Sequence, residues 1–136
     1  AENNMAEAVS SLTYAFAQAT VPKVNVIIKE AYGSAYAVMN SKALGADMVY
    51  AWPDAKVGMM DAGTAAKIMY EKDGIDVINE KARQYEKLQN NVLSAARRGY
   101  VDAVIAPEDT RKYVIAAFEM LFTKREDTPR KKHGTI

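Results

Sequence analysis

Short apolar segments alternate with small-residue turns and helical patterns along residues 21–70, and this alternation restricts the fold more than any other feature of the chain. Residues 24–28 are rich in β-branched side chains, which is typical of a short buried strand. The turn AYGSAY follows and leads into a helical pattern at residues 35–44, with Met39 expected on the inner side. Two further strands and a helix are predicted at residues 48–52, 56–60 and 62–71. Strands that alternate with helices predict an α/β fold with parallel strand pairs.

Helical patterns also flank this segment on both sides. Apolar residues at helical spacing predict a first helix at about residues 4–19. On the C-terminal side we expect helices at about 75–89, at 91–98 and from 107 onward, and a strand within 101–106. The tail from Lys124 is polar and shows no periodic pattern. With 136 residues, no internal repeat and no low-complexity linker, the chain is expected to form one domain.

The AYGSAY turn carries the main candidate for chemistry. Where a strand feeds through a small-residue turn into a helix, the first backbone N–H groups of the helix have no partner inside it. Such groups can hold negative charge that develops on an oxygen, and this oxyanion hole requires no nucleophile and no metal. Gly33, Ser34 and Ala35 supply the small residues. Taken alone, a turn of this kind is more often plain strand–helix geometry, because glycine allows close packing.

Composition excludes several classes of function. The chain has 18 Lys and Arg against 17 Asp and Glu, and a net charge of +1 argues against a nucleic-acid partner. The absence of cysteine excludes disulfides, thiol nucleophiles and thiolate metal sites, and it is consistent with a cytoplasmic protein. No apolar run approaches the roughly 20 residues of a membrane span. His133 is the only histidine and lies in a basic tail, beside Arg130, Lys131 and Lys132, so no metal site is expected.

Five sequence words, in order and in register over nearly the whole chain, resemble the crotonase superfamily. Within it, they are similar to the carboxyltransferase subunit of biotin-dependent acyl-CoA carboxylases and decarboxylases. The words are ATVPKVNVI at 19–27, AYGSAYAVM at 31–39, GADMVYAWP at 45–53, ARRGYVDAVIAPEDTR at 96–111 and PRKKHGTI at 129–136. The resemblance implies a partial ClpP/crotonase-like fold built of ββα units.

The resemblance also implies a domain position. In this family one crotonase-like domain holds the acyl-CoA and a second, C-terminal one holds the biotin ring. Residues 1–136 resemble the later part of the C-terminal domain, so we expect a fragment that lacks the acyl-CoA domain and is inactive alone. The expected partners are a biotin carboxyl carrier protein and further carboxyltransferase subunits in a homo-oligomer. Self-association is also expected because missing strands would leave sheet edges and an apolar face uncovered.

The mechanism that the resemblance implies requires no acid or base from the protein. Carboxybiotin releases CO2, two backbone N–H groups hold the negative ureido oxygen, and the biotin nitrogen takes the α-proton of the acyl thioester. The family's two groups fall on the second Gly and the Ala of its AYGGAY word, which here are Ser34 and Ala35. Serine keeps the N–H but adds a side chain where the ring approaches. Gly33, Tyr36 and Ala37 are expected to line the pocket for biotin and the acyl group.

Two other functions remain open at this point. Asp61 follows the strand predicted at 56–60, where hydratases of the superfamily carry an acidic or basic carboxylate, so a stand-alone hydratase or isomerase is the first alternative. We favour a helix cap for Asp61, because no second carboxylate is paired with it. A non-catalytic assembly fragment is the second alternative. The sequence names neither the acyl group, which is of the propionyl, methylmalonyl or acetyl type, nor the direction of the reaction.

Overall fold

The strands form two small parallel sheets. The computed structural model describes residues 2–127. One sheet has the order β1-β3-β5, with β1 at Val24–Ile27, β3 at Met48–Ala51 and β5 at Ala103–Val104. The other pairs β2 at Glu30–Tyr32 with β4 at Lys56–Gly58, and Tyr32 lies opposite Gly58. Both sheets contain only parallel pairs within the described residues, so the predicted α/β class with parallel strands is confirmed.

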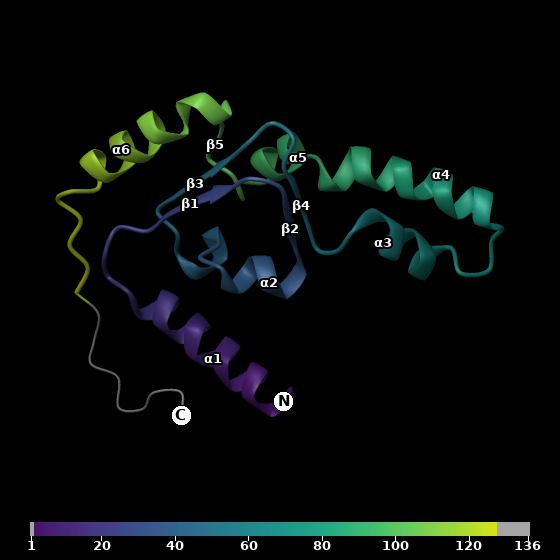
Figure 1. The fold of residues 1–136 in the computed structure, drawn as a ribbon, viewed down its shortest axis with the longest axis horizontal. Helices are drawn as coiled ribbons and strands as arrows, with labels where there is room; N and C mark the ends of the chain where they lie inside the picture. Colours follow the sequence, from purple (N-terminus) through teal and green to yellow (C-terminus); the bar gives the residue numbers. More distant parts are fainter. Residues whose placement is uncertain (1, 128–136) are drawn as a thin grey trace.

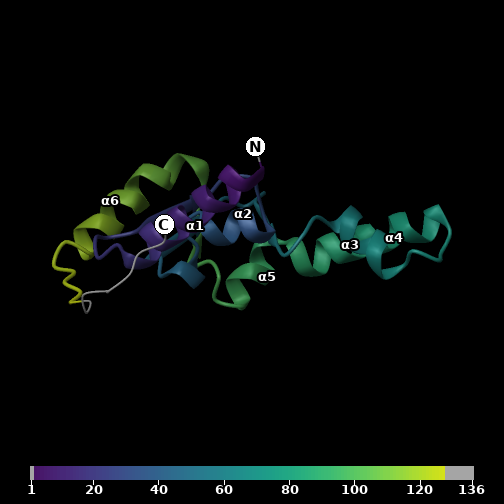
Figure 2. The ribbon, with the colours of Figure 1, turned by 90° about the horizontal axis from the view of Figure 1, so that it is seen from below.

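Helices cover both sides of the strands. Figure 1 shows α1 and α2 on one side of the strands and α6 on the other. The helices α3 and α4 pack against each other as a hairpin that projects away from the sheets (Figure 2). The α-helices are α1 Glu2–Gln18, α2 Gly33–Val38, α3 Ala62–Met69, α4 Ile75–Tyr85, α5 Val92–Arg97 and α6 Thr110–Met120. Two 3₁₀ turns, η1 at Lys42–Leu44 and η3 at Pro107–Asp109, and one π-helical turn, η2 at Glu86–Asn90, complete the fold.

The core is centred on β3, which is buried on both faces. Val49 and Ala51 are fully buried and belong to a cluster that includes Val57 of β4 and Val92 of α5. Between them, Tyr50 points to a second cluster with Ile105 and Ala117 of α6. A central strand of a parallel sheet is buried in this way because helices pack on each of its faces.

The sequence prediction was wrong about the helix expected at 35–44. The structure has the six-residue α2, a break, and then η1. The break lies at Asn40, which has a positive φ of 56°, a conformation that asparagine adopts more readily than most residues. The side chain of Asn25 donates to the carbonyls of Met39 and Asn40 at 3.3 and 3.0 Å and holds the break against β1. As a result Met39 is 60% exposed, and it does not lie on an inner side as predicted.

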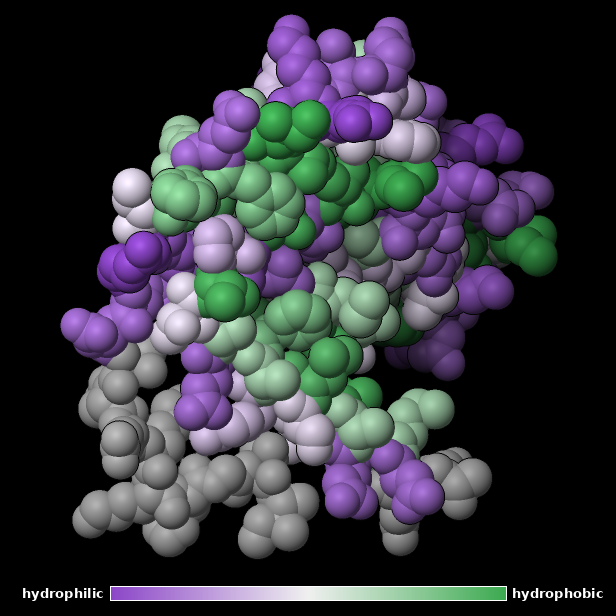
Figure 3. Space-filling model, turned by 60° about the vertical axis from the view of Figure 1, so that its left-hand side comes forward, coloured by the Kyte–Doolittle hydropathy of each residue, from purple (hydrophilic) through white to green (hydrophobic). Residues whose placement is uncertain are grey.

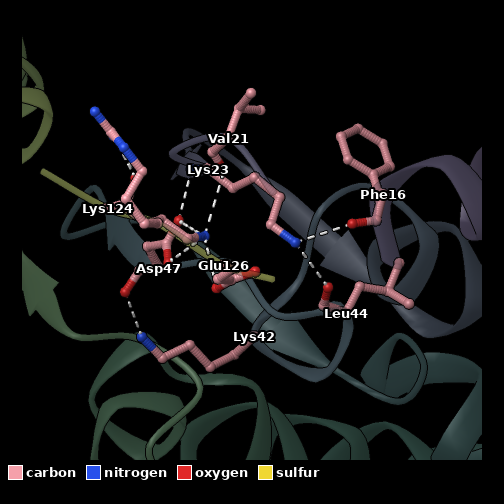
Figure 4. Close-up of polar contacts among 9 residues, drawn as sticks. Phe16, Val21, Lys23, Lys42, Leu44, Asp47, Lys124 and Glu126 are labelled. Atoms are coloured by element: carbon pink, nitrogen blue, oxygen red, sulfur yellow. Dashed lines mark hydrogen bonds and ion pairs between the residues drawn. The ribbon is translucent and has the colours of Figure 1, made fainter. Parts of the chain in front are cut away.

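A partly buried ion pair ties the segment after α6 to the beginnings of β1 and β3 (Figure 4). Lys124 Nζ lies 2.8 Å from the Asp47 carboxylate, and these side chains are only 9% and 17% exposed. The same carboxylate accepts a hydrogen bond from the backbone N–H of Lys23 at 2.7 Å. Lys124 also donates to the carbonyl of Val21 at 3.3 Å and pairs with Glu126 at 3.1 Å. One cation therefore links three segments that are far apart in the sequence.

We expect Lys124→Met to lower the free energy of unfolding by about 1.5 kcal/mol at neutral pH, which is at the low end for the loss of a hydrogen bond to a charged group. The loss is small because the Asp47 carboxylate still accepts the hydrogen bond from the Lys23 N–H in this variant. Burial, the largest single effect, raises the pKa of Asp47, but the hydrogen bonds and charges of Lys124 and Lys23 outweigh it and leave the pKa below 3.8. The Asp47 hydrogen bond is the largest effect on Lys124 and raises the pKa of that amine above 10.5. The ion pair therefore stabilises the fold fully between the ordinary pKa values of 3.8 and 10.5. This contribution is lost as the pH falls through the lowered pKa of Asp47 or rises through the raised pKa of Lys124.

Urea denaturation from pH 3 to pH 7 measures this effect. Lys112→Met is the matched control, because Lys112 is exposed on α6 and makes no ion pair within the described chain. An equal loss of stability in both variants, or a Lys124→Met effect that persists unchanged at pH 3, would contradict the prediction.

Candidate functional site

The β2–α2 turn requires glycine at its centre. Tyr32 ends β2 in an extended conformation, and Gly33 then begins α2 with a positive φ of 60°. A Cβ atom on Gly33 would lie 3.0 Å from the carbonyl oxygen of Met59, which follows β4. Because Tyr32 lies opposite Gly58 in the sheet, the end of β4 passes directly beside the turn. The tight turn into α2 therefore depends both on the freedom of Gly33 in φ and on its lack of a side chain.

The N–H groups of Ser34 and Ala35 are free at the start of α2. Helical N–H groups in the first turn have no partner inside the helix. Within residues 2–127, neither group donates to an acceptor outside the helix, and both residues are exposed. Two adjacent free donors on one turn can converge on a single oxygen, which is the arrangement of an oxyanion hole.

The helix α2 lies between two hollows. The first, which we call the β4 hollow, has a volume of about 230 Å³ and is lined by Gly33, Tyr36, Ala37, Ser41, Ala43, Val57, Gly58, Met59, Ala95, Arg98 and Tyr100. The second, the β1 groove, has a volume of about 390 Å³ and is lined by residues 25–32 together with Ala35, Tyr36 and Met39.

The five residues expected in the site are contiguous, but the two hollows divide them. Gly33 and Ala37 line the β4 hollow, Ala35 lines the β1 groove, and Tyr36 lines both. Ser34 lines neither hollow. A ligand that reaches both free N–H groups would therefore lie over the start of α2.

Tyr36, Arg98 and Tyr100 add polar groups to the apolar β4 hollow. The hydroxyl oxygen of Tyr36 is buried and has no hydrogen-bond partner within the described chain. Burial, followed by the neighbouring Tyr100, raises the pKa of Tyr36, so this hydroxyl stays neutral. Arg98 and Tyr100 were not among the expected site residues, although both fall in the word at 96–111 that carried the family resemblance.

Asp61 caps α3, as expected. Its carboxylate accepts hydrogen bonds from the N–H groups of Gly63 and Thr64 at 2.9 and 3.1 Å. A hydrogen bond with the Thr64 side chain, followed by the N–H groups of Thr64 and Gly63, holds the pKa of Asp61 below its ordinary value of 3.8. A general acid near neutral pH requires a raised pKa, so the environment of Asp61 favours the cap.

Residues 2–127 contain neither a metal-binding cluster nor a membrane-spanning helix. Within this range no group of three or more His, Cys, Asp or Glu side chains is placed to hold a metal ion. None of the helices in the same range is both long enough and apolar enough to cross a membrane. His133 and the basic residues Arg130, Lys131 and Lys132 lie outside the described residues.

Comparisons with known proteins agree with the resemblance seen in the sequence. A family model described as carboxyl transferase domain matches residues 1–136. The propionyl-CoA carboxylase β chain of Saccharopolyspora erythraea is 49% identical over 137 residues, which cover 93% of this chain and 25% of the relative. The methylmalonyl-CoA carboxyltransferase 12S subunit of Propionibacterium freudenreichii subsp. shermanii is 44% identical over 133 residues, covering 93% of this chain and 26% of the relative. The chain thus spans about a quarter of the length of these curated relatives.

Solved structures confirm the predicted crotonase-like fold. The crystal structure of transcarboxylase 12S with methylmalonyl-coenzyme A and methylmalonic acid bound matches with a TM-score of 0.92 and 41% identity, over 98% of this chain and 26% of that one. The β subunit of geranyl-CoA carboxylase from P. aeruginosa matches with a TM-score of 0.74 over 98% of this chain and 27% of that one. Its identity is 20%, so this second likeness concerns the fold alone.

Proposed function

This chain belongs to the carboxyl transferase domain family, and we propose that it forms the biotin-side part of an acyl-CoA carboxyltransferase. The observation that carries the proposal is the pair of free, exposed N–H groups of Ser34 and Ala35 at the start of α2. The ureido group of biotin offers one carbonyl oxygen, which matches two converging donors. The two flanking hollows leave room for the ring and for the acyl group.

In this proposal the chain acts through its backbone. A bound carboxybiotin would supply the carboxyl group and the base for the α-proton of the acyl-CoA. The N–H groups of Ser34 and Ala35 would hold the ureido oxygen, and they need no reorganisation to stabilise negative charge there. Gly33, Tyr36 and Ala37 form the wall beside them, and the neutral Tyr36 hydroxyl adds a donor that is not yet used.

Substrate and partners follow from the relatives as part of the same proposal. Relatives are named for propionyl-CoA and methylmalonyl-CoA, so we infer a short acyl-CoA, with the small side chain of Ala37 beside it. Biotin would arrive on a biotin carboxyl carrier protein, in the cytoplasm. The chain would be the later part of a C-terminal carboxyltransferase domain, and the acyl-CoA would be held by a part outside residues 1–136.

A homo-oligomer is also part of the proposal. The similar transcarboxylase 12S is described as a hexamer assembly. In this chain, large apolar side chains are exposed on α1 and α6, and Figure 3 shows hydrophobic residues, in green, gathered over the side of the molecule that carries α6. Examples are Met5, which is 71% exposed, and Met120, which is 64% exposed. Burial of such a surface against another subunit would be favourable.

Asp61→Asn distinguishes carboxyl transfer from the hydratase or isomerase alternative. Asparagine caps a helix about as well as aspartate, so the stability of the protein should hardly change. We expect near-normal carboxyl transfer from an acyl-CoA such as methylmalonyl-CoA to free biocytin, measured with the complete enzyme that contains this chain. A general acid or base would instead lose roughly 10²–10⁴-fold in rate on this change.

Two controls accompany this experiment. Asp61→Ala removes the cap as well as the carboxylate, so it should lower the melting temperature while Asp61→Asn does not. A collapse of the Asp61→Asn rate with the fold intact would assign Asp61 to catalysis and favour the hydratase alternative. Absence of any transfer to biocytin by the unmodified enzyme would favour the assembly fragment.

A further inference from the structure

Asn90 is a fully buried amide at the end of the π-helical turn η2. Burial of a carboxamide is costly unless its polar atoms are hydrogen-bonded. The Nδ2 of Asn90 donates to the carbonyl oxygen of Met60 at 3.1 Å, whereas its Oδ1 has no partner within residues 2–127. A π-helical turn inserts an extra residue into a helix and often occurs at functional sites. Here it places a polar side chain against β4.

Both ends of η2 contact β4. Lys56, the first residue of β4, forms an ion pair with Glu86 of η2 and a backbone bridge with Asn91. The Asn90 side chain lies so close to Gly58 that a Cβ atom there would collide with Oδ1. Asn90 therefore contacts Gly58, the last residue of β4, and also donates a hydrogen bond to the carbonyl of Met60, two residues further on.

The segment held by Asn90 is also the support of the candidate site. Gly58 pairs with Tyr32, the residue before the turn. The carbonyl of Met59 lies at the position where a Cβ atom of Gly33 would point, at 3.0 Å. Residues 58–60 therefore connect the Asn90 carboxamide to Gly33. The same side chain lies near the Tyr32 hydroxyl, where it opposes the larger effect of burial, which raises the pKa of Tyr32.

We propose that Asn90 is a positioning residue for carboxyl transfer, which fixes residues 58–60 through the Met60 carbonyl and thereby sets the direction of the Ser34 and Ala35 N–H groups. The inference rests on the proposed function of these two groups. Its physical basis is separate, because the path from Asn90 to Gly33 is a set of contacts within this chain. A small displacement of catalytic donors is sufficient to slow a reaction about 10²-fold.

The test compares Asn90→Ala with Asn91→Ala. Asn91 is the adjacent residue and caps α5 by accepting a hydrogen bond from Leu93 N–H at 2.7 Å, but within the described residues its side chain makes no hydrogen bond to Met60. In the 136-residue chain, Asn90→Ala should shift the amide NMR signals of Gly33, Ser34 and Ala35, and Asn91→Ala should leave them in place. In the complete enzyme, Asn90→Ala should lower kcat with biocytin about 10–100-fold with little change in KM, because the donors are misdirected rather than removed.

A double variant separates the hydrogen bond from simple packing. Gly58→Ala places a methyl group in the space that Asn90→Ala vacates, so it restores volume but not the donor to Met60. If the hydrogen bond positions the turn, the double variant keeps the shifted signals and the low kcat. Recovery of both would overturn the proposal, as would unchanged signals in Asn90→Ala or an equal loss of kcat in Asn91→Ala. Shifted signals with an unchanged kcat would support the contact path from Asn90 but exclude an oxyanion role for Ser34 and Ala35, which is a failure of the proposed function.

Discussion

Ala35→Pro is expected to lower kcat for carboxyl transfer by about 10²–10³-fold, the effect of removing one donor from an oxyanion hole. Proline has no backbone N–H, so the variant removes one of the two free donors without touching a side chain that the reaction uses. Ala35 is the third residue of α2, where its N–H has no partner inside the helix, so proline breaks no helical hydrogen bond there, although it disfavours the helical backbone of Ser34. The measurement is the rate of carboxyl transfer between an acyl-CoA and biocytin, with circular dichroism to show that the variant is folded.

Ala62→Pro is the matched control for this prediction. Ala62 is the first residue of α3, and its N–H is not among those that the Asp61 side chain caps. Asp61 has an extended backbone, with φ of −65° and ψ of 154°, which suits a residue that precedes proline. Ala62→Pro therefore also removes one free helical N–H, but away from the turn at Gly33, and should leave kcat unchanged. A folded Ala35→Pro enzyme with normal kcat would exclude the backbone role at this position.

Local pattern was sufficient to locate strands of both sheets. The β-branched run at 24–28 and the apolar segments at 48–52 and 56–60 became β1, β3 and β4, each ending one or two residues earlier than predicted. These segments are short and mostly buried, and a short apolar run in a sequence indicates a buried strand. The three-residue β2 was not predicted, because its sequence EAY is not an apolar run. It is a strand because it pairs with β4.

The break after α2 could not be read from periodicity. Residues 35–44 do show a helical pattern. The chain nevertheless leaves the helix after Val38, because the side chain of Asn25 on β1 donates hydrogen bonds to the carbonyls of Met39 and Asn40. That contact spans fourteen or fifteen positions in the sequence. Tertiary hydrogen bonds of this kind override local propensity.

The oxyanion role of the β2–α2 turn stays a prediction, and the residue that we propose as its support was not found from the sequence. Gly33 stood out because its small-residue turn lies within one of the five words that resemble the family, and the structure gives it a positive φ and two free N–H groups beside it. Asn90 was not found, because its burial depends on a π-helical turn that no repeat in the sequence indicates. Polar side chains in a charged helix are ordinarily solvated, and only the fold shows which one is turned inward.

Gly33→Ala should lower the free energy of unfolding by roughly 2–4 kcal/mol, from the cost of a left-handed conformation and from crowding in a packed site. The added Cβ atom would lie 3.0 Å from the Met59 carbonyl, so residues 58–60 or the start of α2 must shift. Because the same shift misdirects the Ser34 and Ala35 N–H groups, kcat should fall together with stability. Urea denaturation and the biocytin assay measure the two effects separately.

Gly99→Ala isolates the conformational part of that loss. Gly99 has a similar positive φ of 81°, but a Cβ atom there would meet nothing within 4 Å. This variant should therefore lose only the conformational term, about 1–2 kcal/mol, and keep its kcat. The excess loss in Gly33→Ala then reports the contact between the turn and the Met59 carbonyl. Equal losses of unfolding free energy in the two variants would mean that the turn is not tightly packed against the Met59 carbonyl. The end of β4 could then not fix the direction of the Ser34 and Ala35 N–H groups.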